Sequence, residues 1–292
     1  MRLIFCAVIA LLVFVQPCFA KSNFQEEALV LDVNMQAIHL RPTGKKVSAA
    51  VLLIHGWSGQ MNEVGDMFKR YAEQLADNGI ASIRVNIRGE SERERTEFTL
   101  DSTFASRVHD AEVGLKYLLS TYPKARIGIT GFSLGGSTAM ALTGRYPSEV
   151  SSLILWSTAG NPAEMLTRGL SAAEVKTVLE EGEVILPRWE TLRATQKHIL
   201  GMLGHDVFSG LSAFEGALLS IRGSEDYVPA QEQKIIEHAS AKREEYRIFV
   251  GADHIFQSDI RQMVLICCLE IGIIDLFSVP NHLRDQLRLP VC

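Results

Sequence analysis

Short apolar runs alternate with amphipathic segments along most of this chain, and that alternation limits the folds it can adopt. Eight runs have the pattern of strands, at residues 27–33, 36–42, 49–56, 80–87, 125–132, 150–158, 216–223 and 245–252. Helical periodicity marks residues 62–79, 102–123, 133–147 and 230–241, and a last helix is expected from about Ile255. Strands that alternate with helices predict an α/β fold with a mostly parallel sheet of about eight strands and helices on both faces.

The alternation stops between about residues 159 and 213, where the sequence predicts helices and loops without a clear strand. Ser171 and Glu174 form a capping-box pattern at the start of one of these helices. Because open α/β sheets bind ligands at the carboxyl edge of their strands, we expect this insertion to form a helical cap over that edge. Its apolar residues would line a pocket or pack the cap on the core, and they are Met165, Leu166, Leu170, Trp189, Leu200, Met202, Leu203 and Phe208.

The first 20 residues have the pattern of a secretory signal peptide. Arg2 precedes an apolar run from Leu3 to Val15, and the small residue Ala20 ends the expected cleavage site. The run is shorter than the roughly 20 apolar residues that a spanning helix needs, so we expect cleavage and no stable membrane span. An uncleaved anchor is the weaker alternative. The sequence therefore predicts a mature domain over residues 21–292 that is secreted or periplasmic.

Charge and cysteine content exclude some classes of partner. The formal net charge is −5 and no dense stripe of Lys and Arg appears, which argues against a nucleic-acid binder. We interpret Cys267 and Cys268 as buried helix residues, although Cys292 could pair with either one in an oxidising compartment. No cysteine–histidine spacing suggests a metal site, and we expect neither a metal nor an organic cofactor. The oligomeric state stays open.

A serine between glycines follows the predicted strand 125–132. The residues Gly131-Phe132-Ser133-Leu134-Gly135 match the G-x-S-x-G pattern of a nucleophile elbow in its strand–turn–helix setting. Ser133 would adopt a strained backbone that exposes its hydroxyl, and side chains in place of the two glycines would collide with neighbouring elements. A plain turn that needs small residues is the alternative, but a buried strand before it and a helix after it favour the nucleophile.

A serine hydroxyl needs a base to take its proton, and His254 directly follows the last predicted strand. His238, within a helix, and His282, in a polar C-terminal segment, are less suited. A carboxylate must orient the imidazole, and the turn after strand 216–223 favours Asp226 over its neighbour Glu225. Nucleophile, acid and base then follow one another in the chain order expected of this arrangement.

The oxyanion that develops during acyl transfer needs two preorganised N–H donors. Leu134 supplies one at the start of a helix. The loop 55–59 follows an earlier strand, and the amide of Trp57 is the predicted second donor. We expect His55 to hold this loop in place rather than to act as the general base.

These residues together give the chain a clear family resemblance. It resembles α/β-hydrolase-fold serine hydrolases from about Glu27 to the C-terminal helix. Within them it is most similar to bacterial carboxylesterases of the cinnamoyl/feruloyl esterase-like and monoacylglycerol-lipase-like groups. The motifs that carry the resemblance are HGWSG, GIASIRVNIRG, GFSLGG, GSEDYVP and GADHIF. The resemblance implies Ser133 as nucleophile, Asp226 as acid, His254 as base, and Trp57 with Leu134 as oxyanion donors.

One departure leaves the substrate open. Relatives often carry an R-G-x-G-x-S loop, whereas residues 88–91 are shorter and are followed by charges. We expect a carboxylesterase that cleaves small-molecule esters with apolar acyl or aryl groups through an acyl-enzyme. A peptidase, thioesterase or acyltransferase with the same triad stays open, and Glu90, Glu92 or the acidic run 180–183 could anchor the amine of a peptide. A non-catalytic binding protein on the same fold is a further alternative.

Overall fold

A computed structural model of the chain describes residues 23–90 and 98–256. Some predictions concern residues outside these ranges, namely the signal peptide at 1–20, Glu92, the C-terminal helix, Cys267, Cys268, His282 and Cys292. No helix in the two described ranges combines the length and apolarity needed to cross a bilayer.

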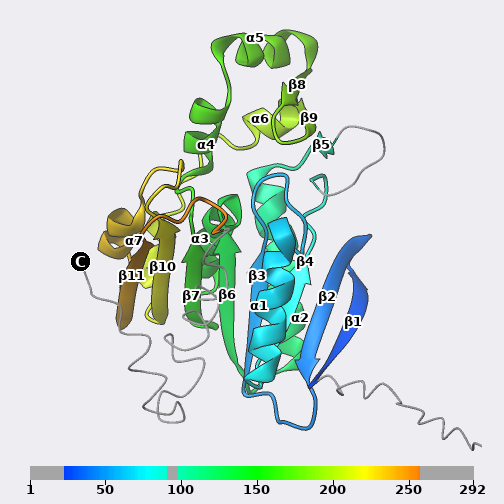
Figure 1. The fold of residues 1–292 in the computed structure, drawn as a ribbon, viewed down its shortest axis with the longest axis vertical. Coiled ribbons are helices and arrows are strands. Elements are labelled where there is room, and N and C mark those ends of the chain that lie inside the picture. Colours follow the sequence, from blue (N-terminus) through cyan, green and yellow to red (C-terminus); the bar gives the residue numbers. More distant parts are fainter. Residues whose placement is uncertain (1–22, 91–97, 257–292) are drawn as a thin grey trace, which may run out of the picture.

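An eight-stranded sheet forms the centre of the molecule, in the order β1-β2-β4-β3-β6-β7-β10-β11 (Figure 1). Its strands are β1 (Phe24–Leu31), β2 (Met35–Pro42), β3 (Ala49–Ile54), β4 (Ala81–Val85), β6 (Arg126–Phe132), β7 (Val150–Trp156), β10 (Ala217–Gly223) and β11 (Arg243–Phe249). β2 runs antiparallel to both β1 and β4, and the other neighbours are parallel. The predicted α/β class with a mostly parallel sheet of about eight strands is confirmed.

Burial on both faces explains why β3 is apolar at every position. Leu52 packs into a core with α2 (Phe104–Thr121) and α3 (Leu134–Arg145), whereas Leu53 packs into a second core with α1 (Met67–Asp77). Successive side chains of a strand point to opposite faces, so a strand covered on both sides has no solvent-facing position for a polar residue. Figure 1 shows α1 lying across the sheet beside β3.

Local sequence signals set where the helices begin and end. Thr103 and Ser106 exchange backbone and side-chain hydrogen bonds at the start of α2. α1 is shorter than the predicted segment, because a 3-10 turn, η1 (Val64–Asp66), precedes it. Gly79 follows α1 with a φ of 80°, a left-handed conformation that glycine adopts without a steric penalty. At the β11 edge of the sheet, α7 (Glu232–His238) links β10 to β11.

The insertion between β7 and β10 is the part of the fold that the sequence analysis described incompletely. It contains α4 (Pro162–Gly169), α5 (Ala172–Glu181), α6 (Gln196–Leu200) and η2 (Ser209–Ala213), and α5 begins with the predicted capping box of Ser171 and Glu174. It also contains a hairpin of β8 (Glu183–Pro187) and β9 (Thr191–Thr195), although no strand was predicted there. Figure 1 shows α4, α5, α6 and the hairpin beyond one end of the large sheet.

The hairpin is stabilised by one buried face. Val184 and Leu186 of β8, and Leu192 and Ala194 of β9, are buried, and these positions alternate with more exposed ones. A third short strand, β5 (Phe98–Leu100), pairs in parallel with β9 and completes a small sheet. Five-residue strands carry too few alternations to stand out from the flanking helical patterns. For this reason the predicted helices are present, but the expectation that the insertion has no strand is wrong.

Candidate active site

Ser133 occupies the sharp turn between β6 and α3. Its backbone has φ 52° and ψ −120°, a conformation that is costly for any residue other than glycine. The turn is held by two backbone hydrogen bonds, from Ser133 N–H to the Trp156 carbonyl at 2.9 Å and from Gly136 N–H to the Ser133 carbonyl at 3.0 Å. A strained serine that the surrounding backbone keeps in place is the geometry expected of a nucleophile elbow.

The two flanking glycines are required by close backbone contacts. A Cβ atom at Gly131 would lie 2.2 Å from the Gly135 carbonyl oxygen, and one at Gly135 would lie 2.1 Å from the Ile54 carbonyl oxygen. Both separations are far below a van der Waals contact, and the obstructing atoms belong to the backbone. The prediction that side chains at these positions would collide with neighbouring elements is confirmed.

Asp226 and His254 meet after β10 and β11. His254 Nδ1 lies 2.8 Å from Asp226 Oδ1, and the Asp226 side chain is completely buried. Burial raises the pKa of Asp226, but the hydrogen bond and charge of His254, together with the Ser157 hydroxyl and the Val228 amide, outweigh it and hold that pKa below its ordinary value. Glu225 is exposed. The structure therefore gives His254 the partner that the sequence analysis favoured, a carboxylate that stays ionised.

The imidazole of His254 lies next to the elbow. Its ring centroid is 4.9 Å from that of Phe132, the residue before Ser133, and 4.6 Å from that of Tyr227. Both Ser133 and His254 are nearly buried. The hydrogen bond to Asp226 uses Nδ1 and leaves Nε2 for a second partner, as proton transfer from a serine hydroxyl requires.

The two predicted oxyanion donors flank the elbow. Leu134 is the first residue of α3, so its amide has no acceptor within the helix. A Cβ atom at Gly56 would lie 3.2 Å from Ser133 Cβ, which places the loop that carries Trp57 against the nucleophile. Among the described residues, neither the Trp57 nor the Leu134 amide donates to a protein acceptor. Both donors are therefore available to a ligand.

We call loop 55–59, which carries the predicted oxyanion donor Trp57, the oxyanion loop. His55 holds this loop in place, as the sequence analysis expected. Its Nε2 accepts a hydrogen bond from Ile87 N–H at 2.9 Å, and its Nδ1 donates to the Gly56 carbonyl at 2.8 Å. Burial, assisted by the charge of Arg107, lowers the pKa of His55 to about 4. A neutral imidazole with both nitrogens engaged cannot serve as the general base for Ser133.

Glu63 is a functional candidate that the sequence analysis missed. Its carboxylate accepts hydrogen bonds from the backbone amides of Gly56 and Val64. Burial raises the pKa of Glu63 to about 7, against the opposing effect of those two amides. Its own φ of 59° shows that the backbone is strained to bring the carboxylate under the loop. No sequence pattern distinguished Glu63 from the other acidic residues of the chain.

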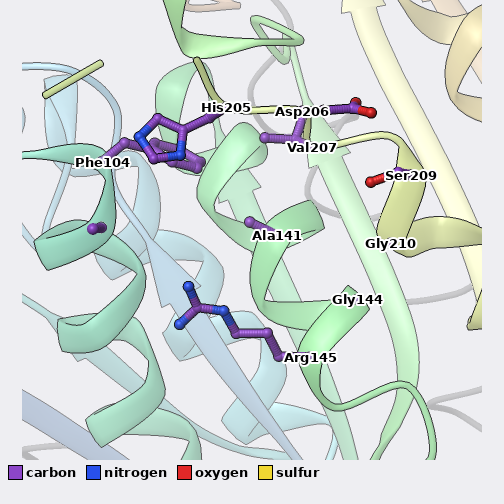
Figure 2. A pocket seen from close by; sticks show the side chains of 10 residues that line it. Phe104, Ala141, Gly144, Arg145, His205, Asp206, Val207, Ser209 and Gly210 are labelled. Carbon is purple, nitrogen blue, oxygen red and sulfur yellow. The ribbon is translucent and has the colours of Figure 1, made fainter. Parts of the chain in front are cut away.

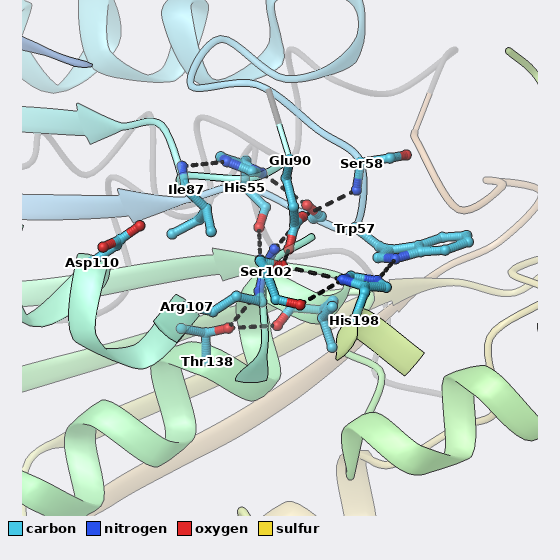
Figure 3. A network of polar contacts seen from close by, with 12 residues as sticks. His55, Trp57, Ser58, Ile87, Glu90, Ser102, Arg107, Asp110, Thr138 and His198 are labelled. Atoms are coloured by element: carbon cyan, nitrogen blue, oxygen red, sulfur yellow. Dashed lines mark hydrogen bonds and ion pairs between the residues drawn. The ribbon is translucent and has the colours of Figure 1, made fainter. Parts of the chain in front are cut away.

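A buried polar network lies beneath the oxyanion loop (Figure 3). Glu90 and Arg107 form an ion pair in which both side chains are fully buried. The hydroxyl of Ser102 donates to Glu90, and Arg107 Nη2 donates to the His55 carbonyl at 2.7 Å. The pairing of Glu90 with Arg107 argues against Glu90 as an anchor for a substrate amine.

The eight cap residues predicted to line a pocket or to pack the cap on the core differ in exposure. Leu166, Met202 and Phe208 are buried in the core, whereas Trp189, Leu200 and Leu203 are exposed. Trp189 packs edge-on against Trp57 with ring centroids 5.9 Å apart. Met165 and Leu170 are partly buried. Three of the eight residues therefore lie fully within the core, and Trp189 connects the cap to the oxyanion loop.

A separate pocket of about 250 Å³ opens between the starts of α2 and η2 and the end of α3 (Figure 2). Its walls include Phe104, Arg145, His205 and Asp206, and they contain none of the predicted catalytic or oxyanion residues. Within the described ranges, no three His, Cys, Asp or Glu side chains are grouped as the ligands of a metal ion would be.

The elbow geometry predicts the effect of one added methyl group. Gly135→Ala forces a Cβ atom against the Ile54 carbonyl and should lower the free energy of unfolding by at least about 1–3 kcal/mol. Urea denaturation measures this change. Gly169→Ala is the matched control, because a Cβ atom there meets nothing within 4 Å. Equal stability of the two variants would contradict the close contact.

The buried ion pair predicts a second stability effect. Arg107→Met leaves the buried Glu90 carboxylate without its cation and should cost about 3–5 kcal/mol in urea denaturation. Arg145→Met is the control, because the Arg145 side chain is half exposed beside Glu112 and its loss should cost less than about 1 kcal/mol. Similar losses in the two variants would refute the assigned difference.

Comparison with solved structures supports the architecture. The structure of Est1E from Butyrivibrio proteoclasticus with bound ferulic acid aligns with a TM-score of 0.68 at 15% identity, over 86% of this chain and 98% of that one. A putative hydrolase from Agrobacterium vitis aligns with a TM-score of 0.67 at 18% identity, over 86% and 99% of the two chains. Dienelactone hydrolase from Anabaena variabilis aligns with a TM-score of 0.59 at 16% identity, over 86% and 98%. At these identities the likeness establishes the α/β-hydrolase fold.

Sequence comparison gives the family. No curated protein matches the sequence at a significant level. The family model described as serine aminopeptidase S33 matches residues 45–207, more than half of the chain. This match includes Trp57, Ser133 and Leu134 and ends before Asp226 and His254, whose pairing is a finding of the structure. The chain belongs to the serine aminopeptidase S33 family of α/β hydrolases.

Proposed function

We propose that this protein is a serine hydrolase that cleaves carboxylic esters, with Ser133 as the nucleophile, His254 as the base and Asp226 as the acid. The observation that carries the proposal is the buried Asp226–His254 hydrogen bond beside a strained serine. The amides of Trp57 and Leu134, which have no acceptor in the described part of the chain, supply the oxyanion hole. Members of the family are hydrolases, and the ester specificity is our inference.

The reaction follows from this geometry. His254 Nε2 takes the proton of the Ser133 hydroxyl as Oγ attacks the ester carbonyl carbon, and the carbonyl oxygen becomes an oxyanion. The Trp57 and Leu134 amides stabilise that charge. His254 then gives its proton to the departing alcohol, which leaves an acyl-enzyme. A water molecule attacks the acyl group in the same way, and Ser133 is regenerated with release of the carboxylic acid.

Ester substrates fit the site better than peptides with a free amino terminus. An aminopeptidase needs a carboxylate that is available to the substrate amine. Glu90 pairs with Arg107, Glu63 accepts the amides of Gly56 and Val64, and Glu183 pairs with Arg193. Glu174 of α5 pairs with Arg188, and Glu180 and Glu181 are exposed on the cap. The exposed Trp189 beside Trp57 supports an apolar or aryl group in the substrate.

The family is described as serine aminopeptidases, so a peptidase is the second candidate function. A substrate panel separates esterase from peptidase activity. We expect hydrolysis of short-chain p-nitrophenyl esters and of aryl esters such as methyl ferulate, with little activity on aminoacyl anilides. The measurement is kcat/KM for each class with the same enzyme preparation. A preference for aminoacyl anilides would show that the protein is a peptidase and would overturn the esterase proposal. Thioester hydrolysis or acyl transfer faster than ester hydrolysis would likewise show a thioesterase or an acyltransferase.

Variants of the three catalytic residues test the mechanism. Ser133→Ala and His254→Ala should each leave only the ~10³–10⁴-fold acceleration over water that binding and the oxyanion hole provide. Asp226→Asn should be nearly as severe, because it removes the charge that stabilises the imidazolium, whereas Glu225→Gln should remain close to wild type. The readouts are kcat and labelling by a fluorophosphonate. A larger loss for Glu225→Gln would refute the acid assignment, and an unlabelled wild type would indicate a binding protein.

A further inference from the structure

Trp57 has a second contact that links the predicted oxyanion hole to the cap. Its indole N–H donates to His198 Nε2 at 2.8 Å, and the two ring planes are only 22° apart, which fits a hydrogen bond between two in-plane nitrogens (Figure 3). His198 belongs to α6, more than a hundred residues away along the chain. The residue predicted to supply the second oxyanion donor is therefore held by its side chain to the insertion above the sheet.

The surroundings of His198 fix which nitrogen carries the proton. Nδ1 lies 2.7 Å from the carbonyl oxygen of Ser102 and donates to it, so Nε2 is the acceptor for the Trp57 indole. The His198 side chain is fully buried. Its backbone amide donates to Thr195 Oγ1 at 3.1 Å, the N-cap of α6. The ring is thus held in one tautomer and one orientation.

The same network holds the oxyanion loop on both sides of Trp57. Before it, the His55 carbonyl accepts a hydrogen bond from Arg107 at 2.7 Å. After it, the Ser58 amide donates to Glu90 at 3.3 Å, and Glu90 pairs with Arg107. Between these two points, the side chain of Trp57 donates its hydrogen bond to His198.

We propose that His198 is a positioning residue for the oxyanion hole, because its acceptance of the Trp57 indole N–H orients the loop so that the Trp57 amide faces the reacting carbonyl. The inference rests on the proposed function, since it concerns the same site of acyl transfer. His198 itself does not contact the reacting atoms. It couples the position of the cap to the rate of the chemical step.

The charges around His198 keep it in the form that the contact requires. Burial lowers its pKa, and Arg107 lowers it further, against the opposing effects of Glu90, the Ser102 carbonyl and Asp101. A neutral ring can accept the indole N–H at Nε2. Protonation would place a hydrogen on Nε2, so that two N–H groups would face each other and the contact would break. The loss of positioning should therefore appear as the pH falls, not as it rises.

Kinetics of cap and loop variants test the inference with an ester that the wild type hydrolyses. Complete loss of an oxyanion donor lowers kcat by ~10²–10³-fold, so displacement of the Trp57 amide in His198→Phe should lower kcat by about 10–100-fold. KM should stay within about twofold, because the interaction acts in the transition state. His198→Gln can still accept a hydrogen bond and should recover part of the loss. Trp57→Phe should lower kcat like His198→Phe, and the double variant should lose no more than either.

The matched control is His205→Phe. His205 is also in the insertion, but its contacts do not include Trp57. Its Nε2–H donates a hydrogen bond to the Gly201 carbonyl at 3.2 Å, and its ring packs on Phe104. Its kcat should remain near that of the wild type. An equal loss in His205→Phe would mean that any damage to the cap lowers activity, and this result would overturn the specific role of His198.

A spectroscopic readout does not depend on activity. The chain has three Trp residues, so a ¹⁵N-labelled sample gives three indole signals, and the Trp57 signal is the one that Trp57→Phe removes. This signal should move in His198→Phe and stay in place in His205→Phe. It should also move in the wild type as the pH is lowered. A Trp57 signal that stays in place in a folded His198→Phe variant would overturn the inference. If that variant proved unstable, a wild-type Trp57 signal that does not move as the pH is lowered would overturn it instead.

The two proposals fail in different ways. A wild type that neither hydrolyses esters nor reacts with a fluorophosphonate would overturn the proposed function, and the positioning role with it. An active wild type whose kcat is unchanged by His198→Phe would overturn the positioning role alone. Losses that multiply in the double variant would have the same meaning, because they would show that Trp57 and His198 act independently.

Discussion

The backbone contact between α3 and the carboxyl end of β3 is the constraint on which the rest of the site depends. Gly135 approaches the Ile54 carbonyl so closely that a single Cβ atom would fill the gap. This contact sets the turn at Ser133 against the loop that carries Trp57. It therefore places the strained nucleophile and both candidate oxyanion amides in one small region, whose geometry does not depend on long, flexible side chains. Preorganised amides of this kind need no rearrangement as charge develops on the substrate.

Beneath that contact lies a buried polar network that serves position more than stability. A fully buried ion pair such as Glu90–Arg107 gains little over an apolar pair of the same shape, because removing both charges from water offsets their attraction. Here the pair fixes the backbone at His55 and Ser58, and through Ser102 it extends to His198 in the insertion. The network thus joins the sheet edge, the oxyanion loop and the cap, so that a change in cap position is felt at the Trp57 amide.

The acid and base are brought together by the topology of the sheet. β6, β10 and β11 are parallel and their carboxyl ends lie along one edge, so the residues that follow them meet although they are far apart in sequence. Asp226 turns inward and is buried, whereas its neighbour Glu225 remains in solvent. Burial alone would favour a protonated Asp226. His254, with the Ser157 hydroxyl and the Val228 amide, reverses that preference and keeps the carboxylate ionised, which is the state that supports an imidazolium.

The amino-acid sequence by itself determined the α/β class, the number of strands in the main sheet and the collision that excludes side chains at Gly131 and Gly135. Apolar periodicity and the collision of a Gly131 side chain with Gly135 act within a few residues of one another. The collision at Gly135 involves the distant Ile54 carbonyl, and it was predictable because the G-x-S-x-G pattern marks a tight strand–turn–helix turn. Only the tertiary structure decided that Glu90 pairs with Arg107, that Glu63 supports the Gly56 amide, that residues 183–195 form a hairpin and that His198 accepts the Trp57 indole. Each of these depends on which distant segments come into contact and exclude water, and a charged or polar residue looks the same in the sequence whether it ends up in solvent or buried beside a partner.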